Sequence, residues 1–370
     1  MSDAPSDLVS RGQAIFERLR TGSQPPVETP PEPHAPEPDK DAQDGEIEST
    51  IAPVAPEPDI SEPREAPPTT ASPVAPVAPI DTVAPSAGPL DDLPEPASPA
   101  SADPDPLRFA RPLPRVIAVT NQKGGVGKTT TAVNLGAALA DQGFRVLVVD
   151  LDPQGNATTG LGLNTRDLQS SMYEVILHDA PIDDCIEATS VRNLFVAPAS
   201  LDLAGAEIEL VPAFSRELKL RKALEEVADD YDYVLIDCPP SLGLLTVNSL
   251  AAATEVLVPI QCEYYALEGL GQLLRNVTLV QKNLNQSLEL SAIVLVMYDA
   301  RTKLSDQVVQ EVKGHFGDKV CRTIVPRTVR LSEAPSYGQP ITAFDPTSRG
   351  AIAYRELAKE VSGGTPQRAR

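Results

Sequence analysis

The fold of this chain is predicted by the stretch Val116-Ile117-Ala118-Val119-Thr120-Asn121-Gln122-Lys123-Gly124-Gly125-Val126-Gly127-Lys128-Thr129-Thr130-Thr131. A β-branched run at 116–119 leads into a glycine-rich turn, and an Ala/Leu-rich helical pattern follows at 132–140. A strand, a glycine-rich loop and a helix in this order are typical of a phosphate-binding loop. The N–H groups of such a turn converge on an anion, and the helix N-terminus adds the positive end of its dipole.

Two side chains of the turn match the chemistry of a bound nucleotide. Lys128 is placed to reach the β- and γ-phosphates, and the Thr129 hydroxyl is placed to bind Mg²⁺. The usual loop has a glycine five residues before its Gly-Lys pair, whereas this chain has Gln122 at that position and a second lysine, Lys123, directly after it.

The second lysine indicates a family. The motif Lys-Gly-Gly-Val-Gly-Lys-Thr-Thr at 123–130 resembles the deviant Walker A motif of the ParA/MinD ATPases, a branch of the P-loop NTPases. In that family the first lysine crosses a dimer interface and contacts the phosphates of the partner's nucleotide, and Lys123 is the matching residue. The resemblance implies ATP and Mg²⁺ as ligands, ATP hydrolysis and an ATP-dependent homodimer. It assigns nucleotide contacts to Lys123, Gly124, Gly125, Val126, Gly127, Lys128, Thr129, Thr130, Pro326 and Arg327.

Composition divides the 370 residues into two parts. Residues 1–110 hold 24 of the 38 prolines and 21 acidic against 6 basic side chains, so they carry 15 of the 21 net negative charges. Such a sequence buries too little apolar surface to offset the entropy of ordering, and we expect residues 22–110 to form a disordered, Pro-rich acidic tail. The overall pI near 4.5 therefore does not describe the remaining chain, and it does not exclude nucleic-acid binding.

The expected organisation has four parts. Residues 1–21 contain apolar side chains loosely at helical spacing, with arginines among them. They favour a short amphipathic helix that docks on a polar or scaffold partner or on a membrane surface, or a nascent helix with no dedicated partner. The tail at 22–110, an ATPase domain at 111–362 and a flexible C-terminus at 363–370 follow. No apolar run approaches the roughly 18 residues of a transmembrane helix, and no signal peptide is evident.

The cysteines and histidines argue against a metal or redox site. The four cysteines are far apart and form no Cys-x-x-Cys pair, which predicts small buried thiols in a reducing cytoplasm. The three histidines are scattered, so a histidine-based metal or catalytic site is not expected.

Strand and helix patterns alternate from residue 111 onward, which predicts an α/β fold with a mostly parallel sheet and helices on both faces. We expect strands at 116–119, 145–150, 194–198, 231–237, 255–260, 288–298 and 320–325. We expect helices at 132–140, 168–177, 203–210, 216–227, up to about 283, at 306–316 and at 350–361.

Carboxylates end two of the predicted strands. Asp150 ends the strand 145–150 and Asp152 follows it, at the carboxyl end of a parallel strand that we expect next to the strand 116–119 of the phosphate loop, where ligands bind. The resemblance assigns Asp152 to hydrolysis, where it orients the attacking water; the alternative is a turn residue that only ends the strand. Asp150 is expected to support the Mg²⁺ shell or its waters. Asp237 ends another buried strand as a Walker B carboxylate and would hold Mg²⁺ through a water. The segment 239–243 resembles the family's second switch loop, which senses the γ-phosphate.

The region from residue 270 onward has 14 basic against 9 acidic side chains. Its segments at 299–301 and 329–335 resemble those of chromosomal, Soj-type ParA proteins, in which arginines matching Arg301 and Arg330 bind DNA without sequence preference. Such binding neutralises phosphates with counterion release and requires a cationic surface rather than base-reading groups. The alternative is that both arginines cap helices or pair with Asp299 and Glu333.

The resemblance as a whole implies a cytoplasmic, nucleoid-associated partition ATPase for a chromosome or plasmid. Its ATP-bound dimer would bind DNA non-specifically, hydrolysis would release it, and a ParB-type centromere-binding protein would stimulate it. The main alternative is a MinD-like membrane-associated positioning ATPase, although residues 361–370 are too polar for that family's C-terminal membrane helix. A bacterial tyrosine kinase would carry a C-terminal tyrosine cluster, and a nitrogenase-reductase-like carrier would need paired cluster cysteines. A scaffold whose tail is the functional part would tolerate loss of Lys128.

Overall fold

A computed structural model describes residue 109 and residues 111–263 and 266–363, with side chains left out at 266–269. Within these ranges eight strands form one sheet in the order β3-β4-β2-β5-β1-β6-β7-β8. All neighbouring strands are parallel except β3 and β4, so the predicted α/β fold with a mostly parallel sheet is confirmed. The strands are β1 Arg115–Val119, β2 Val146–Asp150, β3 Glu187–Ala188, β4 Leu194–Ala197, β5 Tyr233–Asp237, β6 Glu255–Gln261, β7 Glu289–Tyr298 and β8 Val320–Pro326.

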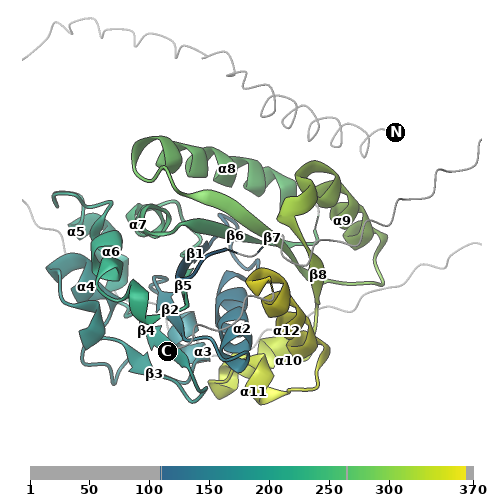
Figure 1. The fold of residues 1–370 in the computed structure, drawn as a ribbon, viewed down its shortest axis with the longest axis horizontal. Coiled ribbons are helices and arrows are strands. Elements are labelled where there is room, and N and C mark those ends of the chain that lie inside the picture. Colours follow the sequence, from purple (N-terminus) through teal and green to yellow (C-terminus); the bar gives the residue numbers. More distant parts are fainter. Residues whose placement is uncertain (1–108, 110, 264–265, 364–370) are drawn as a thin grey trace, which may run out of the picture. The chain divides into compact units, whose positions relative to one another are not determined.

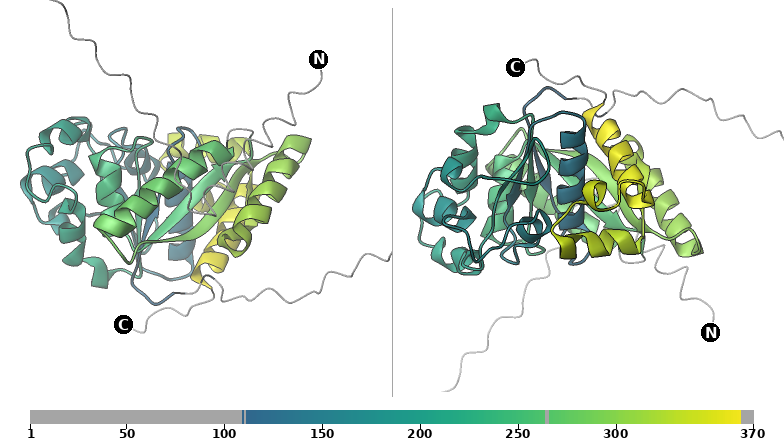
Figure 2. Two further views of the ribbon diagram at one scale, coloured as in Figure 1. Left: turned by 90° about the horizontal axis from the view of Figure 1, so that it is seen from above. Right: turned by 90° about the horizontal axis from the view of Figure 1, so that it is seen from below.

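Helices connect the strands and cover both faces of the sheet. They are α2 Lys128–Asp141, α3 Asn156–Gly160, α4 Met172–His178, α5 Leu203–Glu209, α6 Lys219–Glu225, α7 Leu244–Ala252, α8 Ala266–Asn283, α9 Lys303–Phe316, α10 Val329–Glu333, α11 Ile341–Phe344 and α12 Arg349–Ser362. Short 3₁₀ turns are η1 Ile182–Asp184, η2 Ala228–Asp230, η3 Gly317–Lys319 and η4 Ala334–Tyr337. The helices α2 and α12 lie side by side on one face, and α8 and α9 lie on the other (Figure 1, and the two opposite views of Figure 2).

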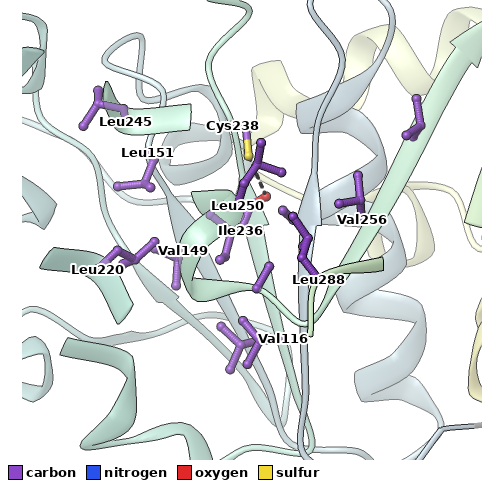
Figure 3. Close-up of a cluster of buried hydrophobic side chains, with 14 of the residues drawn as sticks. Val116, Val149, Leu151, Leu220, Ile236, Cys238, Leu245, Leu250, Val256 and Leu288 are labelled. Carbon is purple, nitrogen blue, oxygen red and sulfur yellow. Dashed lines mark hydrogen bonds between the residues drawn. The ribbon is translucent and has the colours of Figure 1, made fainter. Parts of the chain in front are cut away.

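Two hydrophobic cores lie on the two faces because successive side chains of a strand point in opposite directions. In β1, Val116 and Ala118 enter the core under α4 to α9, whereas Ile117 and Val119 enter the core under α2 and α12. Figure 3 shows part of the first core, where the Cys238 thiol donates to the Ile236 carbonyl at 3.6 Å. All four cysteines are buried free thiols, as their spacing predicts.

A buried ion pair connects the strand starts that lie opposite the glycine-rich loop. Arg115 Nε and Nη2 each donate to a Glu255 carboxylate oxygen at 2.7 Å, which joins the first residues of β1 and β6. Arg115 Nη1 also donates to the Val361 carbonyl at 2.6 Å, near the end of α12. Because every charged atom of this guanidinium is engaged inside the protein, loss of Glu255 would leave a buried cation without its partner.

Some local structure differs from the sequence prediction. The helix expected at 168–177 begins at Met172, because Ser171 and Glu174 form a capping box at its start. The helix α7 and the antiparallel edge strand β3 were not predicted. The amphipathic helix, the tail and the flexible C-terminus expected at 1–21, 22–110 and 363–370 lie almost entirely outside the described residues. Phe109, within the expected tail, is buried in the core under α2 and α12. Among the described helices, none combines the length and apolar character needed to cross a membrane.

Candidate functional site

The loop between β1 and α2 has a backbone that requires glycine at two positions. Gly125 and Gly127 have φ angles of 72° and 79°, in the left-handed region that other residues rarely adopt. Gly127 precedes the first residue of α2, and no described side chain caps this helix. The N–H groups at the start of the 14-residue helix therefore remain available to an anion. This geometry fits the predicted phosphate-binding loop.

Asn121 holds the start of this loop in place. Its side-chain amide donates to the Pro259 carbonyl in β6 at 2.8 Å, and its Oδ1 accepts from the Lys123 N–H at 3.1 Å. Asn121 is not among the residues assigned from the sequence. The available signal was an asparagine directly after a strand, where its side chain commonly accepts from the backbone two residues on.

Lys128 lies buried beneath the loop, with only 6% of its surface exposed. Its ammonium donates to the Lys123 carbonyl at 3.4 Å. Burial lowers the pKa of Lys128, and the opposing charges of Asp237 and Asp152 raise it in part. The lysine predicted to contact the phosphates is therefore next to both carboxylates that were predicted to serve hydrolysis and Mg²⁺.

The strand register brings the carboxylates together. Asp237, at the end of β5, is aligned with Val119 in β1 on one side and with Asp150 in β2 on the other. Asp237 is fully buried, and neither carboxylate oxygen has a hydrogen-bond partner of normal geometry among the described residues. Burial raises the pKa of Asp237 well above its ordinary value, and the negative charges of Asp150 and Asp152 act in the same direction. A buried carboxylate without a partner is costly, so this position fits an incoming cation.

The donor set fits Mg²⁺ bound together with phosphate. The Thr129 hydroxyl is close enough to Asp237 to lower its pKa in part. Within the described ranges, no three histidine, cysteine, aspartate or glutamate side chains converge as a metal cage. Mg²⁺ is usually bound through one or two carboxylates together with substrate phosphates and water, so the pair Thr129 and Asp237 suits it without such a cage.

Asp150 and Asp152 have different surroundings. Asp150 accepts the N–H and hydroxyl of Thr158 at 2.8 and 2.7 Å and the Asp152 N–H at 3.2 Å. Its oxygens thus connect β2 to α3 instead of pointing to an open Mg²⁺ shell, which was the role expected for it. Asp152 is 8% exposed, and its Oδ1 accepts the Gln154 N–H at 3.0 Å. Its carboxylate is the one of the two that is not enclosed by α3.

Lys123, the signature lysine, is half-buried and contacts its own chain. Its ammonium lies 3.8 Å from Glu263 Oε2, with 37% of the lysine and 46% of the glutamate side chain exposed. Glu263 follows β6, and this pair could not be predicted from the sequence because the two residues are 140 positions apart.

Pro326 and Arg327, the other predicted nucleotide contacts, lie at the far edge of the sheet. Pro326 ends β8, and the strands β6 and β7 separate β8 from β1. Arg327 is exposed, and its N–H donates to the Tyr298 carbonyl of β7 at 2.9 Å. The positive charge of Arg327 also acts on Asp299, which follows β7, and the nucleotide role of Pro326 and Arg327 stays a prediction.

Both predicted DNA-binding arginines are exposed, and both are paired within the chain. Arg301 is 87% exposed and donates from Nε and Nη2 to the two Asp299 carboxylate oxygens at 2.8 and 2.6 Å. Arg330 is 57% exposed; its Nη1 lies 3.1 Å from Glu333 Oε2, and its Nε lies 3.3 Å from Asp345 Oδ2. In the single chain, both arginines are therefore paired with neighbouring carboxylates, as the alternative to DNA binding predicts. Exposed ion pairs contribute about 0–1 kcal/mol, so exchanging these carboxylates for phosphates would cost little.

Comparison with known proteins identifies relatives across the described domain. A family model described as an AAA domain matches residues 114–290. The chain is 61% identical over 248 residues to the sporulation initiation inhibitor protein Soj of Bacillus subtilis, which covers 67% of this chain and 98% of that protein. It is 52% identical over 258 residues to the chromosome partitioning protein ParA of Myxococcus xanthus, covering 69% of this chain and 91% of that protein.

A solved structure shows the same fold. It is a Mycobacterium smegmatis protein named cobyrinic acid a,c-diamide synthase, crystallised with ADP and magnesium bound. Its TM-score to this chain is 0.58, with 44% sequence identity over 66% of this chain and 92% of the mycobacterial one.

Proposed function

The chain belongs to the Soj/ParA family of chromosome-partitioning ATPases, and from this membership we propose that it partitions DNA through a cycle of ATP binding, dimerisation and hydrolysis. The observation that carries the proposal is the fully buried, unpartnered Asp237 beside Lys128, at the strand end next to the glycine-rich loop. A mycobacterial structure that is 44% identical was solved with ADP and magnesium, which supports the same ligands here.

The nucleotide end of the site uses the loop and two side chains. The backbone N–H groups of 124–128 and the Lys128 ammonium would bind the β- and γ-phosphates. Thr129 and Asp237 would hold Mg²⁺, which when bound neutralises charge on the phosphates. Asp237 is buried, and among the described residues its carboxylate oxygens have no hydrogen bond of normal geometry, so few protein hydrogen bonds would have to change when the ion binds.

Hydrolysis would depend on Asp152. Its carboxylate lies at the same edge of the sheet as Lys128 and, unlike Asp150, is not enclosed by α3. We infer that it orients the attacking water in line with the γ-phosphate. Phosphoryl transfer relies mainly on positioning and electrostatic stabilisation, so the site requires no separate strong base.

Dimerisation would use Lys123 and the nucleotide of a second copy. In the single chain the ammonium lies near Glu263 at 3.8 Å, a long and partly exposed contact that costs little to break. Lys123 could then turn toward the partner's phosphates, where three or more charged oxygens replace one carboxylate. The homodimer would therefore depend on bound ATP.

DNA binding would use Arg301 and Arg330, which are both exposed and lie in the region from residue 270 onward, where 14 basic side chains stand against 9 acidic ones. A dimer presents each arginine twice, which turns a weak contact into a bivalent one. A ParB-type centromere-binding protein would stimulate hydrolysis, the N-terminal residues 1–21 would bind a further partner, and the chain would associate with the nucleoid.

Other activities are less well supported. A MinD-like membrane regulator shares the nucleotide motifs, but relatives at 52 and 61% identity are named as ParA and Soj. The name of the mycobacterial structure denotes an amide-forming enzyme, yet its 44% identity is lower than that of Soj.

A DNA-retention assay on the full chain tests the proposal. The protein is incubated with DNA and ADP, ATP or a non-hydrolysable ATP analogue, each with Mg²⁺. We expect retention with ATP, the strongest retention with the analogue and little with ADP. Equal retention under all three conditions would contradict a nucleotide-controlled DNA cycle.

A further inference from the structure

Two glycines far apart in sequence touch each other through their backbones. Gly162 follows α3 and Gly338 follows η4, with φ angles of +90° and +62°. A Cβ atom on Gly338 would lie 2.8 Å from Gly162 Cα, and one on Gly162 would lie 3.0 Å from the Gly338 carbonyl oxygen. No side chain could fit between the two segments, so each backbone is directly against the other.

Gly162 is connected through α3 to the carboxylates at the end of β2. The helix α3 begins four residues after Asp152, and its Thr158 donates two hydrogen bonds to Asp150. The Thr158 hydroxyl also accepts the Ala199 N–H at 3.0 Å. Because Asp150 is aligned with Asp237, a change of charge at the strand ends acts directly on the start of α3.

The Gly338 side belongs to the segment that carries Arg330. Helix α10, which contains Arg330, continues directly into η4, and Gly338 ends that turn. Arg330 also lies over the Phe344 ring at 5.8 Å and pairs with Asp345, so α10 to α11 form one packed unit. The start of α11 is bound to the phosphate-loop helix, because the Ile341 N–H donates to Asn134 Oδ1 at 2.6 Å.

A cavity of about 260 Å³ lies where the three segments meet. Its lining includes Thr129 and Thr130 of α2, Thr159 of α3, and Pro335 and Gln339 around η4. Figure 1 shows α3 beside α2, near α10 and α11. The arginine segment thus borders both α2, the helix that would bind phosphate, and α3, which follows the strand-end carboxylates Asp150 and Asp152.

We propose that the Gly162–Gly338 contact couples the nucleotide-bound state of the loop 150–156 to the position of Arg330, with the two glycines acting as positioning residues. This inference rests on the proposed function. Packed side chains can absorb a small shift by changing rotamer, whereas a backbone in contact with another backbone must move with it. Movement of α3 on binding or loss of the γ-phosphate would therefore displace η4 and, with it, the arginine.

The coupling has a thermodynamic corollary. If nucleotide changes the DNA affinity through this contact, DNA must change the nucleotide affinity by the same factor. Replacing either glycine should reduce both effects together while leaving each ligand able to bind.

Hydrogen–deuterium exchange on the unmodified full chain provides the first test. We expect Mg²⁺ with a non-hydrolysable ATP analogue to change exchange in 123–130, in 156–163 and also in 329–344, relative to ADP. If 123–130 shows no change with the analogue relative to the nucleotide-free chain, ATP does not bind and the proposed function fails. If 123–130 and 156–163 respond but 329–344 does not, the coupling fails while the proposed function stands.

The variant Gly338→Ala provides the second test, with Gly317→Ala as the matched control. Gly317 also has a positive φ, +48°, but a Cβ there would meet nothing within 4 Å, so it reproduces backbone strain without the contact. We expect both variants to bind the ATP analogue, measured by fluorescence titration. The ratio of DNA affinities with analogue and with ADP should fall by about 3- to 30-fold in Gly338→Ala only.

Two results would overturn the proposal. One is a folded Gly338→Ala protein that keeps the full affinity ratio and the full exchange response of 329–344. The other is an equal loss of the ratio in Gly317→Ala, which would trace the effect to strain. Should Gly338→Ala not fold, Gly162→Ala applies the same steric test from the other side, and the exchange experiment on the unmodified chain decides independently.

Discussion

The nucleotide site and the surface proposed to bind DNA differ in how their charged side chains are paired. At the ends of β2 and β5, carboxylates are buried, and Asp237 has no hydrogen-bond partner among the described residues. At α10 and the loop after β7, Arg330 and Arg301 are exposed and already paired with neighbouring carboxylates. The first region thus contains a buried carboxylate without a hydrogen bond of normal geometry, whereas the arginines of the second region are paired within the chain.

The difference determines what each region reveals. A buried charge without a partner is costly, so its presence indicates the sign and the kind of group that is missing. An exposed arginine with a carboxylate beside it is common on protein surfaces, contributes little to stability and indicates no ligand by itself. The nucleotide site is therefore supported by geometry as well as by family, whereas the DNA surface depends mainly on family and on local charge.

The largest expected effect is in the buried region. Lys128→Ala removes the only lysine that is buried beside Asp237 and Asp152 in the described ranges. ATP affinity, measured by fluorescence titration, should fall by at least about 100-fold, because charge-assisted hydrogen bonds contribute roughly 1.5–3 kcal/mol each. Lys359→Ala, at a surface lysine paired with Glu356, should leave the affinity unchanged. Near-native ATP affinity in Lys128→Ala would show that the buried Lys128 ammonium does not bind the nucleotide, and the two regions would then no longer differ in this respect.

The next effect separates chemistry from binding within the same region. Asp152→Ala should slow ATP turnover by on the order of 100-fold through loss of water positioning, with ATP affinity retained. Phosphate release and analogue binding measured on the same preparation distinguish the two. Asp167→Ala, at a surface turn, serves as the control. Normal turnover would assign Asp152 to the turn alone.

A moderate effect concerns the exposed region. Arg330→Ala should reduce the slope of log affinity for DNA against log salt by about one per lost phosphate contact, hence about two per dimer. ATP binding should persist, and the melting temperature should change little because the ion pairs are exposed. Arg221→Ala removes a similarly exposed arginine, paired with Glu225 on α6, and should not alter the slope. An unchanged slope together with a lower melting temperature would show that Arg330 is purely structural.

The smallest effect is a pH dependence in the buried region. Burial raises the pKa of Asp150 from 3.8 to about 6, so the folded protein keeps a proton that the unfolded chain has released. The stabilisation from this proton is complete below about pH 4 and is lost as the pH rises through about 6. In Asp150→Asn, whose side-chain carbonyl can still accept from Thr158, the fall in melting temperature of the ligand-free protein between pH 4 and 7 should be smaller.

The surface residue Asp179 serves as a control because its pKa is shifted in the opposite direction from that of Asp150. Lys219 holds the pKa of Asp179 below its ordinary value, so its contribution to stability is lost as the pH falls. Asp179→Asn should therefore lower the melting temperature at neutral pH, and its difference from the unmodified chain should shrink as the pH falls. Parallel pH profiles for Asp150→Asn and the unmodified chain would show that Asp150 is ionised in the folded protein at all these pH values.

The sequence predicted the sheet well because its strands are short apolar runs ending at polar residues. The predicted strands 145–150, 255–260 and 320–325 differ from the structure by one residue each. The strand order was predicted less well: the strand 145–150 was expected beside β1, but β5 lies between them, and this order is what places Asp237 next to Asp150. Elements were missed where the pattern is weak: α7 mixes apolar residues with the buried polar residues Thr246, Asn248 and Ser249 and follows two prolines, and β3 has two exposed residues.

Long-range contacts could not be predicted from the sequence. The pairing of Arg330 with Glu333 was foreseeable from a spacing of three residues, whereas its pairing with Asp345 depends on the turn of η4. The Lys123–Glu263 and Gly162–Gly338 contacts join segments more than 100 residues apart. Nothing in the sequence indicates which backbone a glycine contacts, so the Gly162–Gly338 contact could be found only in the structure.

The Arg115 ion pair has a consequence for how such a domain can be extended or rearranged. Its guanidinium contacts the Val361 carbonyl at 2.6 Å, so the entry into β1 and the last turn of α12 meet at one place. That place is the opposite edge of the sheet from the nucleotide loops, which follow the carboxyl ends of β1, β2 and β5. Evolution could thus fuse new modules before Phe109 or after residue 363 without disturbing catalysis, and a circular permutant joining these two points should keep its ATPase core.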